Sequence, residues 1–322
     1  MGLLALPPSG LYRPASAQTK VRITTGLRTT SQSIAWVGTE AGVFRRHGLD
    51  VSFPRLEVGG FESAAGLTDG DWEFAQTDAA SIAEAVLNGR DAVVLLNNTA
   101  PHVALFIVTR REITSLDQLD GKQVGVLNDA YYSQTGTVRV ILEQSGATAS
   151  YVGHGTYEDI YAALEVGEIS AGALPVAFRL VGQREHRWNV FETAVLDAPA
   201  VFATTRTLIA SNRELVLRAV RAFVETIHLF RTQPDVVVPL LQDFLRLSDW
   251  KAANDLSEFY APLFPAVPRP ALLRMQDIRD LFSRRYPAVR GFQETQISDP
   301  SLIDQVEQSG FIEQLYTRDS VL

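Results

Sequence analysis

The chain has 322 residues, which allows about two domains, and its composition is that of an ordinary globular protein, with 46% hydrophobic and 20% charged residues. This composition excludes intrinsically disordered and collagen-like chains, and the formal net charge of −8 makes nucleic acid and anionic lipid poor partners. The absence of cysteine excludes disulfides, iron–sulfur clusters, cysteine nucleophiles and cysteine-ligated zinc.

The N-terminal segment stands apart from the fold. Residues 15–17 read Ala-Ser-Ala before Gln18, a small-residue pattern of the type found at signal-peptide cleavage sites. The segment before it has no basic start and only a short apolar run. Residues 1–18 are therefore either the remnant of a signal peptide whose start lies upstream or an N-terminal tail, and both interpretations stay open.

Strands and helices alternate in the first third of the chain. Val21–Thr25 is rich in β-branched residues, which favours a strand. The apolar spacing over 33–46 predicts a helix, which His47-Gly48 ends. Further patterns predict strands over 49–56, 72–75 and 92–96, and helices starting at Gly59-Gly60 and at Asp78. The strand over 92–96 is wholly apolar, which is typical of a central parallel strand.

The middle of the chain repeats this alternation. Ser115 and Gln118 have capping-box spacing, and Thr156 with Asp159 forms a second cap pattern. These patterns predict helices over 116–120, 135–144 and 157–166 and strands over 105–109, 123–127, 150–152, 170–174, 190–194 and 200–205.

After Asn212 the pattern changes to helices without a clear strand. Arg213–Arg231 carries Leu215, Ala219, Phe223 and Ile227 on one face and predicts a long amphipathic helix. Further helices are predicted over 235–247, 250–260, 270–286 and 301–315. Two blocks of alternating strands and helices indicate an α/β fold with two open, mostly parallel sheets flanked by helices, followed by additional C-terminal helices.

Ligands in open α/β sheets bind beyond the carboxyl ends of the strands. These positions here are short polar runs, several of them at helix starts, where free N–H groups favour an anion. They comprise 28–32, 76–78, 97–99, 128–135, 154–156 and Pro175. Two such blocks predict a cleft that encloses a small anionic or polar solute.

Three stretches of the chain resemble a known family. Val21–Asp50, with Gly42-Val43-Phe44 and His47-Gly48-Leu49-Asp50-Val51, is similar to the solute-binding proteins of nitrate/sulfonate/taurine-type ABC importers, the SsuA/THI5-like group. Ala64–Phe74 and Ser115–Val126 resemble two further stretches of that family, and the match spans most of residues 20–240. The resemblance implies a type II periplasmic binding-protein fold, closure on a ligand, a monomer in the periplasm, and ABC permease and ATPase subunits as partners.

The resemblance also implies the arrangement of the two lobes. Residues 19–104 and 206–322 are expected to form a discontinuous first lobe, on which the C-terminal helices pack. Residues 105–205 are expected to form the second lobe with the hinge strands.

The resemblance carries site residues over unevenly. Thr30 and Ser31 match the turn after the first strand, Ser133-Gln134-Thr135-Gly136 match the helix start after the middle strand, and Thr77-Asp78 match the turn after the third strand. Asp78 departs from the small residues usual there. It either caps its own helix, the favoured interpretation, or faces the cleft, where it favours a hydroxyl or amine over an anion. The full candidate ligand-binding set is Thr30, Ser31, Gln32, Thr77, Asp78, Asn97, Asn98, Asn128, Tyr132, Ser133, Gln134, Thr135, Gly136 and His154.

Several single residues have two interpretations. Tyr131 and Tyr132 either stack on a flat ligand, which favours an organic solute, or pack within their loop. Trp36 is expected in the core rather than the cleft wall, and Arg139 on a helix surface rather than on an anion. His154 is either a ligand contact or a solvated loop residue.

The leading function is non-enzymatic capture of a small organic anion or polar heterocycle for import. The histidines are scattered and no metalloprotease motif is present, so neither a metal nor a cofactor is expected. Gly153-x-Gly155-x-x-Glu158 lacks the third glycine of a dinucleotide fingerprint. The alternative function is an enzyme of the same fold, similar to those of thiamine-pyrimidine or menaquinone synthesis.

Overall fold

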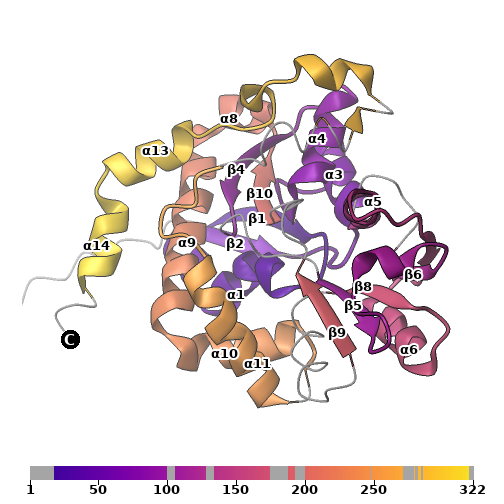
Figure 1. Cartoon of the computed structure of the whole chain (residues 1–322). Helices are drawn as coiled ribbons and strands as arrows, with labels where there is room; N and C mark the ends of the chain where they lie inside the picture. Colours follow the sequence, from indigo (N-terminus) through magenta and orange to yellow (C-terminus); the bar gives the residue numbers. More distant parts are fainter. Residues whose placement is uncertain are drawn as a thin grey trace, which may run out of the picture.

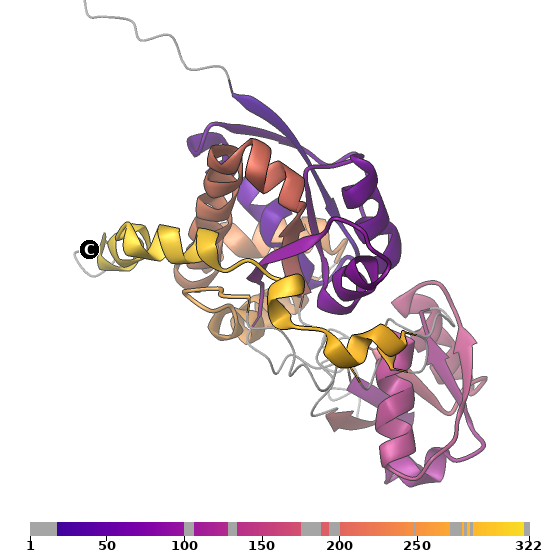
Figure 2. The same cartoon turned by 90° about the horizontal axis from the view of Figure 1, so that it is seen from above.

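The computed structural model describes residues 18–99, 106–127, 134–174, 188–192, 200–247, 249–270, 279, 282–283 and 286–318. Two five-stranded sheets form the centres of two lobes, and helices cover both (Figure 1). Figure 2 shows the second lobe, in magenta and pink, set to one side of the larger first lobe. The expected α/β class with two mostly parallel sheets is confirmed.

The first sheet has the strand order β2-β1-β3-β10-β4. Its strands are β1 (Thr19–Thr25), β2 (Leu49–Ser52), β3 (Phe74–Asp78), β4 (Val93–Asn97) and β10 (Ala200–Thr204). β1 pairs in parallel with β2 and β3, whereas β10 runs antiparallel between β3 and β4. Residues 200–204, expected within the segment that holds the second lobe and the hinge strands, therefore pair within the first sheet.

The second sheet has the strand order β7-β6-β8-β5-β9. Its strands are β5 (Phe106–Arg110), β6 (Gln123–Val126), β7 (Ser150–Gly153), β8 (Ala171–Leu174) and β9 (Trp188–Glu192). β6 is parallel to β7 and β8, and β5 is antiparallel to β8 and β9. In each sheet three adjacent strands run parallel to one another. The fourth strand in the order, β10 in the first sheet and β5 in the second, runs antiparallel to both of its neighbours.

Two layers of helices enclose the first sheet. Because successive side chains of a strand point to opposite faces, Ala75 packs with α3 (Gly60–Asp69) and α4 (Ala79–Leu87), whereas Phe74 packs on the other face. That second face is covered by α1 (Ile34–Glu40), α2 (Val43–Arg46) and the 20-residue α9 (Arg213–Thr232).

Helices also cover both faces of the second sheet. α5 (Gln134–Gln144) packs with Ile107 and Val124, and α6 (Tyr157–Val166) packs with Phe106 and Val108 on the opposite face. The expected cap of α6 is present, since Thr156 Oγ1 accepts a hydrogen bond from the N–H of Asp159.

The described part of the chain after β10 consists of helices joined by loops, with one isolated β-bridge between Ser298 and Val94. It contains α8 (Arg206–Ser211), α10 (Pro234–Phe244), α11 (Trp250–Tyr260), α13 (Ser301–Gln308), α14 (Phe311–Arg318) and the short 3₁₀ segments Ala261–Leu263, Pro287–Gly291 and Glu294–Gln296. α9 packs on α1 and α2, so these helices belong to the first lobe. Among the described helices, none has both the length and the apolar sequence needed to cross a bilayer.

Three local predictions need correction. The single helix predicted over 33–46 is two helices, because Gly42 adopts a left-handed φ of 73°. The helix predicted over 301–315 is broken in the same way at Gly310, where φ is 74°. Ser115 makes no side-chain cap, and Gln118 instead accepts from the N–H of Thr114. The helix predicted over 270–286 lies largely outside the described residues.

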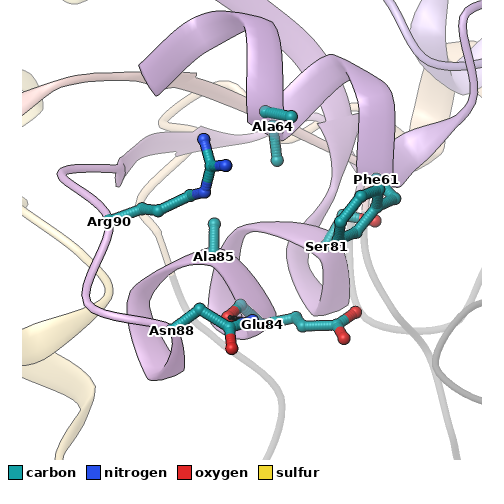
Figure 3. A pocket seen from close by; sticks show the side chains of 8 residues that line it. Phe61, Ala64, Ser81, Glu84, Ala85, Asn88 and Arg90 are labelled. Atoms are coloured by element: carbon teal, nitrogen blue, oxygen red, sulfur yellow. Dashed lines mark hydrogen bonds between the residues drawn. The ribbon is translucent and has the colours of Figure 1, made fainter. Parts of the chain in front are cut away.

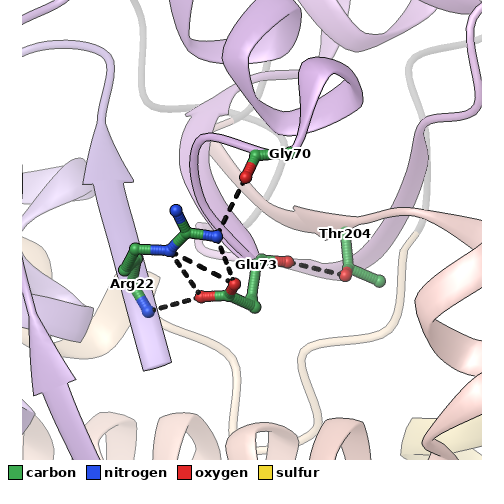
Figure 4. A network of polar contacts seen from close by, with 4 residues as sticks. All are labelled: Arg22, Gly70, Glu73 and Thr204. Atoms are coloured by element: carbon green, nitrogen blue, oxygen red, sulfur yellow. Dashed lines mark hydrogen bonds and ion pairs between the residues drawn. The ribbon is translucent and has the colours of Figure 1, made fainter. Parts of the chain in front are cut away.

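A network of ion pairs and hydrogen bonds stabilises the amino edge of the first sheet (Figure 4). The Arg22 guanidinium donates to Glu73 Oε1 at 2.6 Å and to the carbonyl of Gly70 at 2.9 Å. The hydroxyl of Thr204 donates to the carbonyl of Glu73 at 2.8 Å. The network joins β1, β3 and β10 at the amino edge of the sheet. The predicted ligand site lies at the opposite, carboxyl edge.

Candidate functional site

Most of the predicted first-lobe residues gather at the carboxyl edge of the first sheet. Thr77 and Asp78 end β3, and Asn97 ends β4. The 3₁₀ turn Thr30–Gln32 follows β1, and the N–H of Asn98 donates to the carbonyl of Ala200 at 2.7 Å. Residues separated by up to about half of the chain are thus held along one edge.

The backbone of Ser31 connects the turn after β1 to β3 and to the residue that follows β4. Its carbonyl accepts from Asn98 Nδ2 at 2.9 Å and from Gln76 Nε2 at 3.2 Å. Gln32 Oε1 in turn accepts from the N–H of Leu27 at 2.8 Å. These bonds fix the turn after β1 against β3 and β4, and they settle which way the amides of Gln76 and Asn98 point.

Asp78 caps α4, as the favoured interpretation expected. Its Oδ1 accepts from the N–H of Ser81 at 2.8 Å, and its Oδ2 accepts from the Ser81 hydroxyl at 2.8 Å. Burial raises the pKa of the Asp78 carboxyl, although the hydrogen bonds from Ser81 act in the opposite direction. The carboxylate therefore takes the position at the α4 N-terminus that an anion would otherwise occupy.

Two glycines make room for these groups. A Cβ on Gly26 would lie 3.0 Å from Thr77 Oγ1 and 3.1 Å from Gln32 Oε1, so two oxygens converge on the space above this glycine. A Cβ on Gly60, the first residue of α3, would lie 2.1 Å from Asp78 Oδ2. The starts of α3 and α4 approach each other only because position 60 lacks a side chain.

Three buried oxygens at this edge have no hydrogen-bond partner. They are Thr25 Oγ1, Thr77 Oγ1 and Asn98 Oδ1, and all three residues are fully buried. Buried polar atoms in folded proteins nearly always have a partner, and each exception calls for a physical explanation. A bound solute is one group that could supply the missing partner.

Arg28 brings a positive charge to the loop after β1, but its guanidinium is engaged. Its Nε donates to Glu57 Oε2 at 2.6 Å, and its Nη1 donates to the carbonyl of Phe244 at 2.5 Å. The guanidinium also lies 5.5 Å from the ring centroid of Phe244. Since the carboxylate of Glu57 balances the charge of Arg28, the pair contributes little net charge to the edge.

The second lobe offers a smaller set of predicted residues. Thr135 and Gly136 are buried in the first turn of α5, and His154 follows β7 with its N–H on the carbonyl of Val126 at 3.0 Å. His154 Nε2 is a buried atom without a partner. Gln134 begins α5, whereas Asn128, Tyr131, Tyr132 and Ser133 lie outside the described residues.

Two aromatic or basic residues with open interpretations pack against neighbours. The Trp36 ring lies 5.4 Å from that of Phe244 and packs against the core of the first lobe. The Arg139 guanidinium lies 4.9 Å from the ring centroid of Tyr151. The position of Trp36 agrees with the expected core packing, whereas Arg139 is half-buried against Tyr151 rather than fully on the helix surface.

A cavity of about 330 Å³ lies between α3 and α4 (Figure 3). Phe61, Ala64 and Ser81 contribute to its wall, and the Arg90 side chain reaches toward it from the loop after α4. It adjoins the strand-end site at Ser81, whose hydroxyl binds Asp78. Arg90 is itself bound to Thr68 and Asp69.

Sequence reasoning missed several residues that shape this edge. Gln76 lay within a predicted turn but not among the candidates, although a glutamine at the end of an apolar strand signals a buried polar partner. Gly26, Gly60 and Ser81 act through their size and their contact with Asp78, which only the packing reveals. Within the described chain, no group of three or more His, Asp and Glu residues is placed to hold a metal ion.

Comparison with known proteins places this geometry in context. The family model described as NMT1/THI5 like matches residues 30–236. No curated protein matches the sequence.

Solved structures with low sequence identity share the fold. The periplasmic aliphatic sulphonate binding protein SsuA from Escherichia coli is 18% identical, with a TM-score of 0.69 over 88% of this chain and 92% of that one. The alkanesulfonate-binding protein SsuA from Xanthomonas axonopodis pv. citri, bound to MOPS, is 14% identical, with a TM-score of 0.66 over 86% and 95%. The periplasmic nitrate-binding protein NrtA from Synechocystis PCC 6803 is 10% identical, with a TM-score of 0.68 over 91% and 89%.

Proposed function

The chain belongs to the NMT1/THI5-like family, and from this premise we propose that it is the substrate-binding component of an ABC importer. It captures a small organic anion or polar heterocycle between its two lobes and delivers it to the membrane permease. In this proposal the protein is exported to the periplasm as a monomer, and its partners are the permease and the ATPase that energises it.

The observation that carries the proposal is the polar edge of the first sheet. Thr25, Thr77 and Asn98 hold buried oxygens without partners at the carboxyl ends of the strands, where open α/β sheets bind their ligands. The fold shared with sulfonate- and nitrate-binding proteins supports the same role. Thr135, Gly136 and His154 would form the opposite wall when the lobes close.

A ligand screen tests the proposal. A solute that binds only the folded protein stabilises it by RT ln(1 + [L]/Kd), so at one hundred times Kd it adds about 2.7 kcal/mol. We expect at least one compound from a panel of sulfonates, carboxylates and nitrogen heterocycles to raise the melting temperature and to appear unchanged in native mass spectra.

The same screen separates import from catalysis. If a compound of the panel is converted to product at a rate that follows protein concentration, the alternative of an enzyme is correct. A panel in which no compound shifts the melting temperature would also contradict the proposal.

A further inference from the structure

The unpartnered atoms at the carboxyl edge of the first sheet indicate what kind of group binds there. Asn98 Nδ2 donates to the carbonyl of Ser31 at 2.9 Å, which requires the amide nitrogen on that side. The buried atom without a partner is therefore Oδ1, which is an acceptor. Only a group with an N–H or O–H can satisfy it.

The oxygens above Gly26 lead to the same conclusion independently. Gln32 Oε1 accepts one hydrogen bond from the N–H of Leu27, and a carbonyl oxygen has two lone pairs. Thr77 Oγ1, which borders the same space, is a hydroxyl that can either donate or accept. A donor group that reached these two oxygens would find one acceptor at Gln32 Oε1 and a second at Thr77 Oγ1 by rotation of the hydroxyl.

Asp78 sets the charge of this edge. Its carboxylate already fills the start of α4, bound to the N–H and hydroxyl of Ser81, so this helix terminus cannot receive a solute anion. The charge of Arg28, the basic residue in the loop after β1, is balanced by Glu57 at 2.6 Å. The edge therefore presents two amide acceptors, a negative charge and two hydroxyls that can donate or accept, whereas sulfonate and nitrate offer acceptors alone.

We infer that the solute presents an N–H or O–H donor, carried by a neutral or positively charged polar group, to the carboxyl edge of the first sheet. Asp78 is then a specificity-determining residue that excludes purely anionic groups from this edge. The inference rests on the proposed function. Among the solutes proposed there, it selects polar compounds that bear nitrogen or hydroxyl groups rather than sulfonates or carboxylates.

Matched probes test this preference. Benzamidine, benzamide and benzoate share one ring and differ in whether they offer donors and in charge, and ethanolamine and ethanesulfonate form a second pair. Isothermal titration of the full chain is expected to give the donor-bearing member of each set at least tenfold tighter binding than its anionic counterpart.

Two variants of Asp78 make the test specific. Asn is as good an N-cap as Asp, so Asp78→Asn keeps α4 while removing the charge, and it is expected to reduce the donor-to-anion ratio at least threefold. Asp78→Ser also keeps a cap and vacates room at the helix start, so it is expected to gain affinity for the anionic probes. Melting temperature and circular dichroism check that both variants fold.

Asp91→Asn is the matched control. Asp91 accepts from the N–H groups of Arg206 and Thr207 at the start of α8, just before β4, and so lies at the opposite edge of the sheet. This variant is expected to leave every ratio unchanged.

The possible results separate the inference from the proposed function. Tighter binding of the anionic probes by the unmodified protein, or ratios that neither Asp78 variant changes, would overturn the inference and leave the proposed function standing. If neither these probes nor any compound of the ligand screen binds, both fail together.

Discussion

Individual residues decide how closely the parts of the site can approach. Gly60 shows this directly, because a Cβ there would lie 2.1 Å from Asp78 Oδ2 and 2.3 Å from Ser81 Oγ. The glycine is not at a left-handed φ, so its role is one of space rather than of backbone conformation. The absence of one methyl group lets two helices begin side by side at the carboxyl edge.

Gly60→Ala is expected to destabilise the protein by about 1–3 kcal/mol, since the new methyl must push apart the Asp78–Ser81 pair. Urea unfolding monitored by circular dichroism measures the change. Gly291→Ala is the control, because no atom lies within 4 Å of a Cβ built at that position. Equal unfolding free energies for the two variants would show that the start of α3 tolerates a side chain.

Glu225 on α9 is a titratable residue whose carboxylate links α9 to Arg46 and His47 and so stabilises the first lobe. Burial opposes its ionisation, but hydrogen bonds from His47 at 2.7 Å and from Arg46 at 2.7 Å outweigh burial and hold the pKa of Glu225 below its usual value. A carboxyl whose pKa is lower in the folded state contributes stability above its unfolded pKa, and this contribution disappears as pH falls through the folded pKa.

Glu225→Gln is therefore expected to cost about 1 kcal/mol at pH 7 and to flatten the loss of unfolding free energy below about pH 4.3, the ordinary glutamate value. Urea unfolding at a series of pH values between neutral and acidic measures both effects. Glu168→Gln, at an exposed position, should reproduce the unmodified curve. Parallel curves for Glu225→Gln and the unmodified chain would contradict the assignment.

Among the elements, β4 departs furthest from its sequence pattern. Its five residues are all buried, which predicts a central strand, yet it lies at the edge of the first sheet. The C-terminal segment explains this burial. The N–H of Val94 donates to the carbonyl of Ile297 at 2.8 Å, and the N–H of Asp299 donates to the carbonyl of Val94 at 3.0 Å. Since both backbone groups of Val94 are bound by this segment, part of the strand edge is shielded from pairing with another chain.

Ile297→Ala is expected to cost about 2–5 kcal/mol, because Ile297 is fully buried in the core beside α4 and its truncation leaves a cavity. It should also increase aggregation on heating by loosening the cover over β4, which light scattering detects. Val166→Ala, at a position 79% exposed, should stay within about 0.5 kcal/mol of the unmodified protein. A stable, non-aggregating Ile297→Ala would refute the covering role.

The sequence predicts an element correctly where interactions within a few residues determine it. Apolar spacing and turn residues correctly place β1, α4 and α9, and the Thr156 cap, because periodicity and capping act within a few residues. The edge position of β4 and the insertion of β10 between β3 and β4 depend on pairing with distant segments. The break at Gly42 depends on its φ of 73°, which a helical pattern on both sides conceals.

The candidate site, too, could be predicted from the sequence only in part. The rule that ligands bind at strand ends places Thr77, Asp78 and Asn98 in advance. The partners that determine their chemistry could not be placed, because the contact of Ser31 with Asn98 spans 67 residues of sequence. The sequence predicts which segments meet, whereas only the packing shows which oxygen is left without a donor.

At the scale of the whole molecule, the chain passes from the first sheet to the second between β4 and β5 and returns between β9 and β10. Each sheet has its own pair of helical layers, and the hydrogen bonds of the described first-lobe site run between elements of that lobe. Each lobe has a hydrophobic cluster of its own, and a third cluster joins Phe106 and Ile160 of the second lobe to core residues of the first. Hinged domains close on a ligand by rotating about their connections, and closure here would have to keep or repack this shared cluster.

A distance measurement between the lobes tests this expectation. The chain has no cysteine, so Val236→Cys and Val166→Cys introduce two exposed thiols, on α10 of the first lobe and at the end of α6 of the second. With spin labels at both positions, we expect a saturating ligand to shift the mean distance and narrow its distribution, since closure selects one arrangement of the lobes. The pair Val236→Cys and Glu313→Cys, within the first lobe, should not change. An unchanged inter-lobe distance, with ligand binding demonstrated by calorimetry, would mean that the solute binds to an already closed protein and that the hinge plays no part in capture.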